Sequence, residues 1–171
     1  GGSAVNISKT SVSGSIEFYN ASGIFAGYTY ELDPNNLVDW TWPITLTWDG
    51  SAGTDWNVAA NWTPSMGAPF VPTGAENVII PTGISNYPVI STGNAKTANL
   101  TINTSAYLYL TAGNDSDYDL FVSGDFVNNG TFIQSTANDT LVFAGNWVNT
   151  GSVTLNGLVI ASSAPSAKVI N

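Results

Sequence analysis

The sequence predicts an all-β protein, and within that class a parallel β-solenoid (β-helix) with coils of about 20–22 residues and a Trp-rich N-terminal cap. Three observations predict this fold. Asn, Thr, Ser and Gly contribute 19, 19, 18 and 17 of the 171 residues, and these types suit outward faces and corners. Strong helix formers are scarce, with one Met and three Lys. A sequence motif also recurs at a fixed offset.

The recurring motif spans residues 123–132 and returns at 144–153, at an offset of 21. Both glycines, the aromatic residue, the first valine and one Asn recur in register. Stacked coils bring equivalent residues together, so a fixed period is typical of a repeat architecture. Two similar hairpins in an ordinary antiparallel β domain remain the alternative interpretation.

A short strand pattern recurs beside the motif, with apolar residues at its first and third positions. Such residues point to the same side of a strand, so the pattern predicts one ladder of inward-facing side chains. The ladder also predicts that Asn128 lies next to Asn149 at a turn. Corner glycines with unusual φ are expected at 124, 130, 145 and 151. The five strands are Val78-Ile79-Ile80, Leu100-Thr101-Ile102, Leu120-Phe121-Val122, Leu141-Val142-Phe143 and Leu158-Val159-Ile160.

Four segments follow from this pattern. Residues 1–25 are interpreted as the tail of a preceding β-solenoid module, because 13–20 are similar to 150–156. Residues 26–47 are expected to connect it to a Trp-rich cap at 48–76. The coils are predicted at 77–171, continuing beyond that stretch. A cap is expected because the end of a solenoid exposes apolar core and unpaired strand edges.

Composition excludes several partners and chemistries. The net charge is −9 and there is no Arg, His or Cys. Nucleic acids and anionic membranes attract Lys and Arg clusters, so neither is expected as a partner. No apolar run is long enough to span a membrane, so no membrane insertion is predicted. Without Cys, stability must come from packing and hydrogen bonds.

The residues around the cap resemble a known type of module. The resemblance begins at Trp48, Asp55-Trp56, Asn61-Trp62 and Val71-Pro72, continues through Val78–Pro81 and Asn99–Ile102, and covers about residues 48–160. This run is similar to repeat modules in very large surface proteins of Bacteroidota, and its start resembles the G8-type module. Such proteins are commonly exported by the type IX secretion route and act as adhesins or surface filaments.

The resemblance implies a non-catalytic structural or adhesive segment of a large secreted bacterial surface protein. The implied location is extracellular, at the cell surface. The implied partners are neighbouring modules of the same chain, with secretion-machinery proteins or surface glycans as further partners. The alternative is a carbohydrate-binding module of an extracellular polysaccharide-processing protein.

Catalysis is not expected, because a chain without His or Cys lacks most acid/base and nucleophilic dyads. Paired carboxylates remain a route to polysaccharide cleavage. The one acidic cluster is Asp115, Asp117 and Asp119, between two apolar stretches, which predicts a coil corner.

Calcium binding is a better explanation of that cluster than catalysis, since carboxylate oxygens on a turn suit hard cations. The loop from Asp49 to Asp55 is a second candidate. Neither has the spacing of an EF-hand or a calcium β-roll, so a solvated acidic turn is the favoured interpretation. No other cofactor is expected.

The run Tyr107-Leu108-Tyr109-Leu110 supplies the candidate ligand-binding residues. If both Leu side chains face inward, Tyr107 and Tyr109 face outward on one strand. Adjacent exposed aromatic rings can stack on sugar rings, although exposed Tyr on a β face is also common without a ligand.

Overall fold

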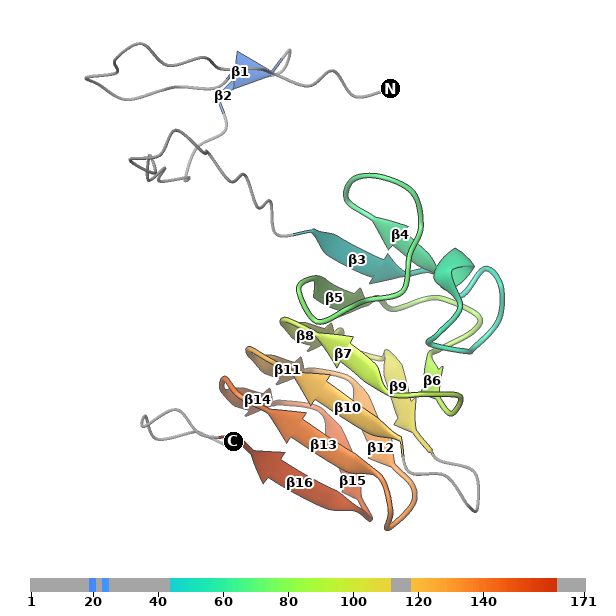
Figure 1. Ribbon diagram of the computed structural model, residues 1–171, viewed down its shortest axis with the longest axis vertical. Coiled ribbons are helices and arrows are strands. Elements are labelled where there is room, and N and C mark those ends of the chain that lie inside the picture. The colour runs from blue at the N-terminus through green and yellow to red at the C-terminus, as the bar shows by residue number, and fades with distance from the viewer. Residues whose placement is uncertain (1–18, 21–22, 25–43, 112–117, 163–171) are drawn as a thin grey trace, which may run out of the picture. The chain divides into compact units, whose positions relative to one another are not determined.

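The computed structural model describes residues 19–20, 23–24, 44–111 and 118–162 (Figure 1). The chain divides into two compact units, 1–42 and 43–171. In the first unit, β1 (Tyr19–Asn20) pairs antiparallel with β2 (Gly23–Ile24). The other residues of 1–25, and all of 26–43, lie outside the described residues. The predicted preceding module therefore stays a prediction.

The second unit is a parallel β-solenoid of about four turns with three sheets, and its coils stack in chain order (Figure 1). Sheet 1 contains β7 (Ala95–Thr97), β10 (Asp119–Val122), β13 (Thr140–Phe143) and β16 (Leu158–Ala161). Sheet 2 contains β3 (Thr45–Trp48), β4 (Trp62–Pro64), β5 (Asn77–Ile80), β8 (Leu100–Ile102), β11 (Phe126–Asn128) and β14 (Trp147–Asn149). Sheet 3 contains β6 (Val89–Ile90), β9 (Tyr107–Leu110), β12 (Thr131–Gln134) and β15 (Ser152–Leu155).

Each full coil visits the three sheets in the same order, so every strand pairs with its equivalent in the next coil. Asp119 pairs with Thr140, Phe126 with Trp147 and Thr131 with Ser152, each 21 residues on. All of these pairs are parallel, which confirms the solenoid and removes the hairpin alternative. Other coils differ in length, since Leu120 pairs with Ala95 and Thr140 with Leu158.

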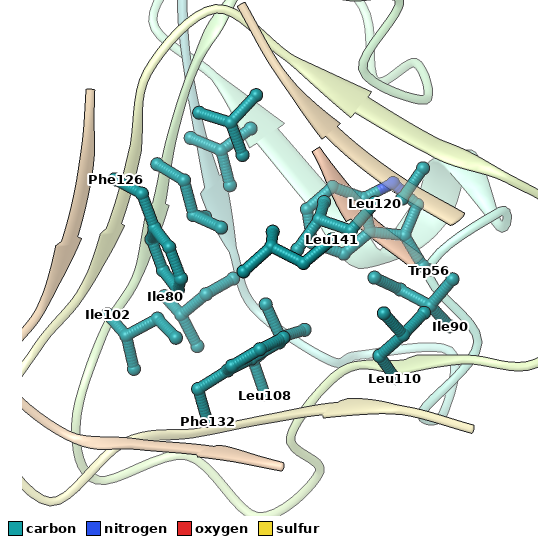
Figure 2. Close-up of a cluster of buried hydrophobic side chains, with 14 of the residues drawn as sticks. Trp56, Ile80, Ile90, Ile102, Leu108, Leu110, Leu120, Phe126, Phe132 and Leu141 are labelled. Carbon is teal, nitrogen blue, oxygen red and sulfur yellow. The ribbon is translucent and has the colours of Figure 1, made fainter. Parts of the chain in front are cut away.

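Inward-facing side chains of all three sheets meet in one continuous core (Figure 2). Strands β5 to β13 show strict alternation, with buried residues at every second position, because successive side chains point to opposite faces. Aromatic side chains also contact one another across coils: the rings of Phe126 and Trp147 stack at a centroid distance of 5.3 Å. Fully burying one such side chain contributes about 1.5–3 kcal/mol.

The N-terminal cap follows the same three-sided path as the coils. Strand β3 pairs parallel with β5, and isolated bridges place Asp55 beside Val89 in sheet 3 and Thr73 beside Lys96 in sheet 1. Strand β4 pairs antiparallel with β3 and forms the outer edge of sheet 2. The prediction assigned residues 26–47 to a connecting segment, whereas β3 begins at Thr45 and belongs to the cap.

Three tryptophans fill the interior of the cap. Trp48, Trp56 and Trp62 are fully buried, and Trp62 packs edge-on against both others at centroid distances of 4.9 and 4.7 Å. The indole of Trp62 donates a hydrogen bond to the Trp56 carbonyl at 2.8 Å. The 3-10 helix Ala59–Asn61 between Trp56 and Trp62 is the only helical element among the described residues.

Polar ladders connect the corners of successive coils. Asn99 donates through Nδ2 to Oδ1 of Asn77 at 2.8 Å and accepts from the Asp125 amide at 2.7 Å. Asp125 accepts in turn from the Asn146 amide at 2.7 Å. These bonds satisfy backbone groups where the chain leaves the sheets.

The predicted contact between Asn128 and Asn149 is confirmed. Asn128 is fully buried at the end of β11 and donates through Nδ2 to Oδ1 of Asn149 at 2.7 Å. The same amide donates to the Ser152 carbonyl at 3.0 Å. One buried side chain therefore joins two strands of the next coil.

The corner glycines are needed for a reason other than the predicted one. None of the glycines at 124, 130, 145 and 151 has a positive φ. A Cβ on Gly130 would instead lie 2.4 Å from the carbonyl oxygens of Asn103 and Ala106. A Cβ on Gly151 would lie 2.0 Å from the Gly130 carbonyl oxygen. Close stacking of one corner on the next therefore excludes a side chain.

The single ladder predicted for five apolar strands is wrong. Val78–Ile80 and Leu100–Ile102 pair within sheet 2, whereas Leu120–Val122, Leu141–Phe143 and the last strand pair within sheet 1. The last strand is also shifted by one residue, because Leu141 pairs with Val159 rather than with Leu158. A one-residue shift reverses the faces of a strand, and Leu158 and Ile160 are accordingly 56% and 40% exposed.

Candidate functional site

Tyr107 and Tyr109 point outward from β9, as the sequence predicts. Leu108 and Leu110 are fully buried on the opposite face of the strand, and Tyr107 is 38% exposed. The two phenol rings are nearly parallel, with 8° between their planes and 6.3 Å between their centroids. The outer face of sheet 3 therefore presents two aligned aromatic rings.

Stacking of the coils adds a third ring, which sequence reasoning missed. Tyr87 lies in the loop before β6, and its ring meets Tyr107 edge-on at a centroid distance of 5.2 Å. Its hydroxyl donates to the Ser105 carbonyl at 3.2 Å, which fixes the ring against the next coil. We call Tyr87, Tyr107 and Tyr109 the tyrosine face.

The tyrosine face has the chemistry of a stacking surface. Aromatic rings offer a large apolar area, and phenol hydroxyls add a hydrogen-bonding edge. On β12, the residues that pair with Tyr107 and Tyr109 are Thr131 and Ile133, which continue the outer face with smaller side chains. This combination suits a flat ligand with polar edges, such as a sugar ring.

The first calcium candidate is only partly described. Asp115 and Asp117 lie outside the described residues. Asp119 begins β10, and its Oδ1 accepts a hydrogen bond from the Thr140 amide at 3.0 Å. This carboxylate therefore takes part in the contact between two coils of sheet 1. The calcium role of the cluster stays a prediction.

The loop from Asp49 to Asp55 uses both of its carboxylates to hold turns. Asp49 accepts from the Ser51 amide at 2.8 Å and from the Thr63 hydroxyl at 2.6 Å. The hydrogen bond from Thr63 is the main cause that lowers the pKa of Asp49 below its ordinary value. Asp55 accepts from the Asn57 amide at 2.9 Å and the Thr92 hydroxyl at 2.8 Å.

Glu76 is held in the same way. It is mostly buried and accepts from the amide of Thr73 at 2.7 Å and from its hydroxyl at 3.0 Å. Within the ranges that the structure describes, no three His, Cys, Asp or Glu side chains gather as metal ligands would. The carboxylates with identified contacts therefore act as hydrogen-bond acceptors inside the fold.

No helix among the described residues combines the length and the apolar character needed to cross a membrane.

Comparison with known proteins gives one match. No curated protein and no solved structure is similar enough to match this chain. One family model matches residues 47–159, which extend from the end of β3 into β16 and so include the cap and all full coils. The chain therefore belongs to the family described as "Domain of unknown function (DUF8693)".

Proposed function

We propose that this chain is a non-catalytic structural and adhesive segment of a large secreted bacterial surface protein, exported as a type IX secretion cargo. The structural role is supported by one observation: polar side chains at the corners form hydrogen bonds between neighbouring coils. Asn77, Asn99, Asp125 and Asn146 form one ladder across four coils, and Asp119 binds the Thr140 amide. These groups stabilise a stack rather than surround a reaction centre.

A stack of this kind acts as a spacer. Each added coil lengthens the solenoid by about 4.7–4.9 Å, because neighbouring strands are separated by that distance. One core cluster includes buried side chains of all three sheets, and its close packing is expected to resist bending between coils. The surface location and the export route are supported by the resemblance of the segment that starts at Trp48 to surface-protein modules.

Immunolabelling of intact cells that produce the parent protein tests this function. Antibodies against the solenoid are expected to label intact cells, and external protease is expected to remove the label. Labelling only after the cells are permeabilised would contradict the proposed location. Release of oligosaccharides from a polysaccharide panel by the purified chain would contradict the non-catalytic role.

The tyrosine face favours carbohydrate binding as a second function. A glycan array with the purified chain is expected to give a defined ligand, and Tyr107→Ala is expected to weaken its binding by about tenfold or more, or about 1.4 kcal/mol. Tyr107→Phe keeps the ring and separates stacking from hydrogen bonding. Thr101→Ala, on the outer face of sheet 2, is the control. Equal binding by wild type and Tyr107→Ala would exclude the tyrosine face as the binding surface.

A further inference from the structure

A second surface lies on the outer face of sheet 1 and is independent of the tyrosine face. Lys96, Phe121, Val142 and Ile160 are register partners in four successive strands, so they form one row along the solenoid. Outward positions of a sheet normally carry polar side chains, because they face water. Three apolar members in one row depart from that pattern.

Three members of the row, Lys96, Phe121 and Val142, line a groove of about 290 Å3. Small residues create it, because Ser123, Ala144 and Ser162 come directly after β10, β13 and β16 and leave space beside Phe121 and Val142. The backbone amides of these three residues all donate hydrogen bonds to carbonyl oxygens of the preceding coil, with N–O distances of 2.9–3.0 Å. These bonds hold the backbone that lines the groove in place. Lys96 lines the groove on β7, and Gly74, which follows the bridge between Thr73 and Lys96, lines it on the side of the cap.

The shape and lining of the groove indicate an elongated apolar ligand. The lining residues run from Lys96 on β7 to Ser162 after β16, which crosses three inter-strand spacings, a length of about 14 Å. The volume is at the lower end of the range for small-molecule sites, and it suits about ten non-hydrogen atoms. The Ser123 hydroxyl lies 3.4 Å from the carbonyls of Gly74 and Thr97, within the fold's own hydrogen bonds.

The positive charge of Lys96 indicates which end group the ligand carries. Lys96 is the one cationic side chain among the described residues, in a chain of net charge −9. It is exposed, and no described carboxylate is found in an ion pair with it. An ammonium group beside an apolar groove complements a carboxylate on an apolar body.

We propose that this groove binds a linear aliphatic carboxylate. The carboxylate is held by the Lys96 ammonium, and the aliphatic chain lies over Phe121 and Val142 along the solenoid. The binding energy comes from the apolar area that the chain covers, and the ion pair sets the direction in which the ligand lies.

Titration of the full chain with octanoate, followed by amide NMR shifts, tests this proposal. Octanoate is expected to bind in the millimolar range and to shift the amides of residues 96, 121, 142 and 144. Octylammonium has the same chain and the opposite charge, and it is expected to bind at least about tenfold more weakly. Shifts of equal size with both probes would overturn the proposal.

Two substitutions assign the parts of the groove. Lys96→Gln removes the charge of an exposed side chain, so it is expected to weaken octanoate binding by about two- to fivefold. The same substitution removes a like charge from the octylammonium site, so octylammonium is not expected to bind more weakly. Val142→Thr places a hydroxyl in the groove at equal volume and is also expected to weaken octanoate. Val127→Thr, an outward position of sheet 2, is the matched control and should leave the affinity unchanged.

Three results would contradict the proposal. Unchanged octanoate affinity in Lys96→Gln would remove the charge argument. Equal weakening by Val142→Thr and Val127→Thr would place the probe elsewhere. Absence of shifts in β10 and β13 of the wild type would show that the groove does not accept the probe.

Discussion

At the scale of single residues, corner glycines limit how closely the coils can stack. Gly130 is buried at the corner between β11 and β12, and a Cβ there would meet two carbonyl oxygens and the Ile102 side chain. Because the clashing atoms are mainly backbone, a side chain could fit only if two coils moved apart.

Gly130→Ala is therefore expected to lower the free energy of unfolding by about 1–3 kcal/mol. Gly93→Ala is the control, since its Cβ would approach only the Asn57 side-chain amide, at 3.2 Å, and its φ is not positive. We expect the control to change stability by less than about 0.5 kcal/mol. Urea unfolding measures both, and equal stability of the two variants would refute the stacking explanation.

Asp49 contributes stability that depends on pH. The hydrogen bond from the Thr63 hydroxyl favours the ionised carboxylate and lowers its pKa in the folded state. A group whose folded pKa is lowered stabilises the fold above its unfolded pKa, near 3.9, and this stabilisation is lost as the pH falls through the folded pKa.

Asp49→Asn is expected to be less stable than wild type at pH 7, and the difference should shrink as the pH is lowered from about 5 towards 2. Asn cannot ionise, but its side-chain oxygen can still accept from the Ser51 amide. Unfolding titrations at several pH values measure the difference. A difference that stays constant across this range would mean that the charge of Asp49 contributes nothing.

At the scale of elements, the cap depends on how its tryptophans are bonded. The Trp62 indole donates to the Trp56 carbonyl, whereas no hydrogen-bond partner is found for the buried Trp56 indole nitrogen. The two side chains are equally buried, so substitution of either removes similar apolar area. They differ mainly in their polar contact.

Trp62→Phe is accordingly expected to lower the free energy of unfolding by about 1–2 kcal/mol more than Trp56→Phe, because it leaves the buried Trp56 carbonyl without its donor. Trp56→Phe instead removes an unsatisfied donor from the core. Thermal unfolding of the two variants provides the comparison. A larger loss in Trp56→Phe would indicate that the Trp56 nitrogen does have a partner.

The sequence predicts the elements well only where coils have equal length. The motif at 123–132 and 144–153 lies in coils that pair at a constant offset of 21, and there the strands and the Asn128–Asn149 contact are predicted correctly. The ladder fails elsewhere because all three sheets share the same apolar alternation. Leu100–Ile102 and Leu120–Val122 therefore look equivalent, although they belong to different sheets.

The candidate site was predictable within one strand and not across coils. Alternation within β9 places Tyr107 and Tyr109 outward without any knowledge of the neighbouring coils. Tyr87 joins them only because Val89 pairs with Tyr109 in the next coil. The row of Lys96, Phe121 and Val142 spans offsets of 25 and 21, so no fixed period could reveal it.

At the scale of the whole molecule, the two ends of the described solenoid differ. At one end, antiparallel β4 covers the edge of sheet 2 and the tryptophans fill the interior. At the other end, apolar side chains of β14, β15 and β16 are partly exposed, among them Val148, Leu155 and Leu158. Between these ends, the fold is held by parallel pairing of each coil with the next. The proposed spacer role depends on this parallel stacking.

Disulfide formation in double-cysteine variants tests the parallel stacking most directly, because the chain has no cysteine of its own. Thr131 pairs with Ser152 and Ile133 with Thr154 in the outer face of sheet 3. Parallel stacking predicts that cysteines at 131 and 152, or at 133 and 154, oxidise readily, since their Cα atoms are within disulfide range. The crossed pairs, 131 with 154 and 133 with 152, lie about 8 Å apart and should stay reduced. Preferential oxidation of the crossed pairs, as antiparallel strands would give, would contradict the solenoid.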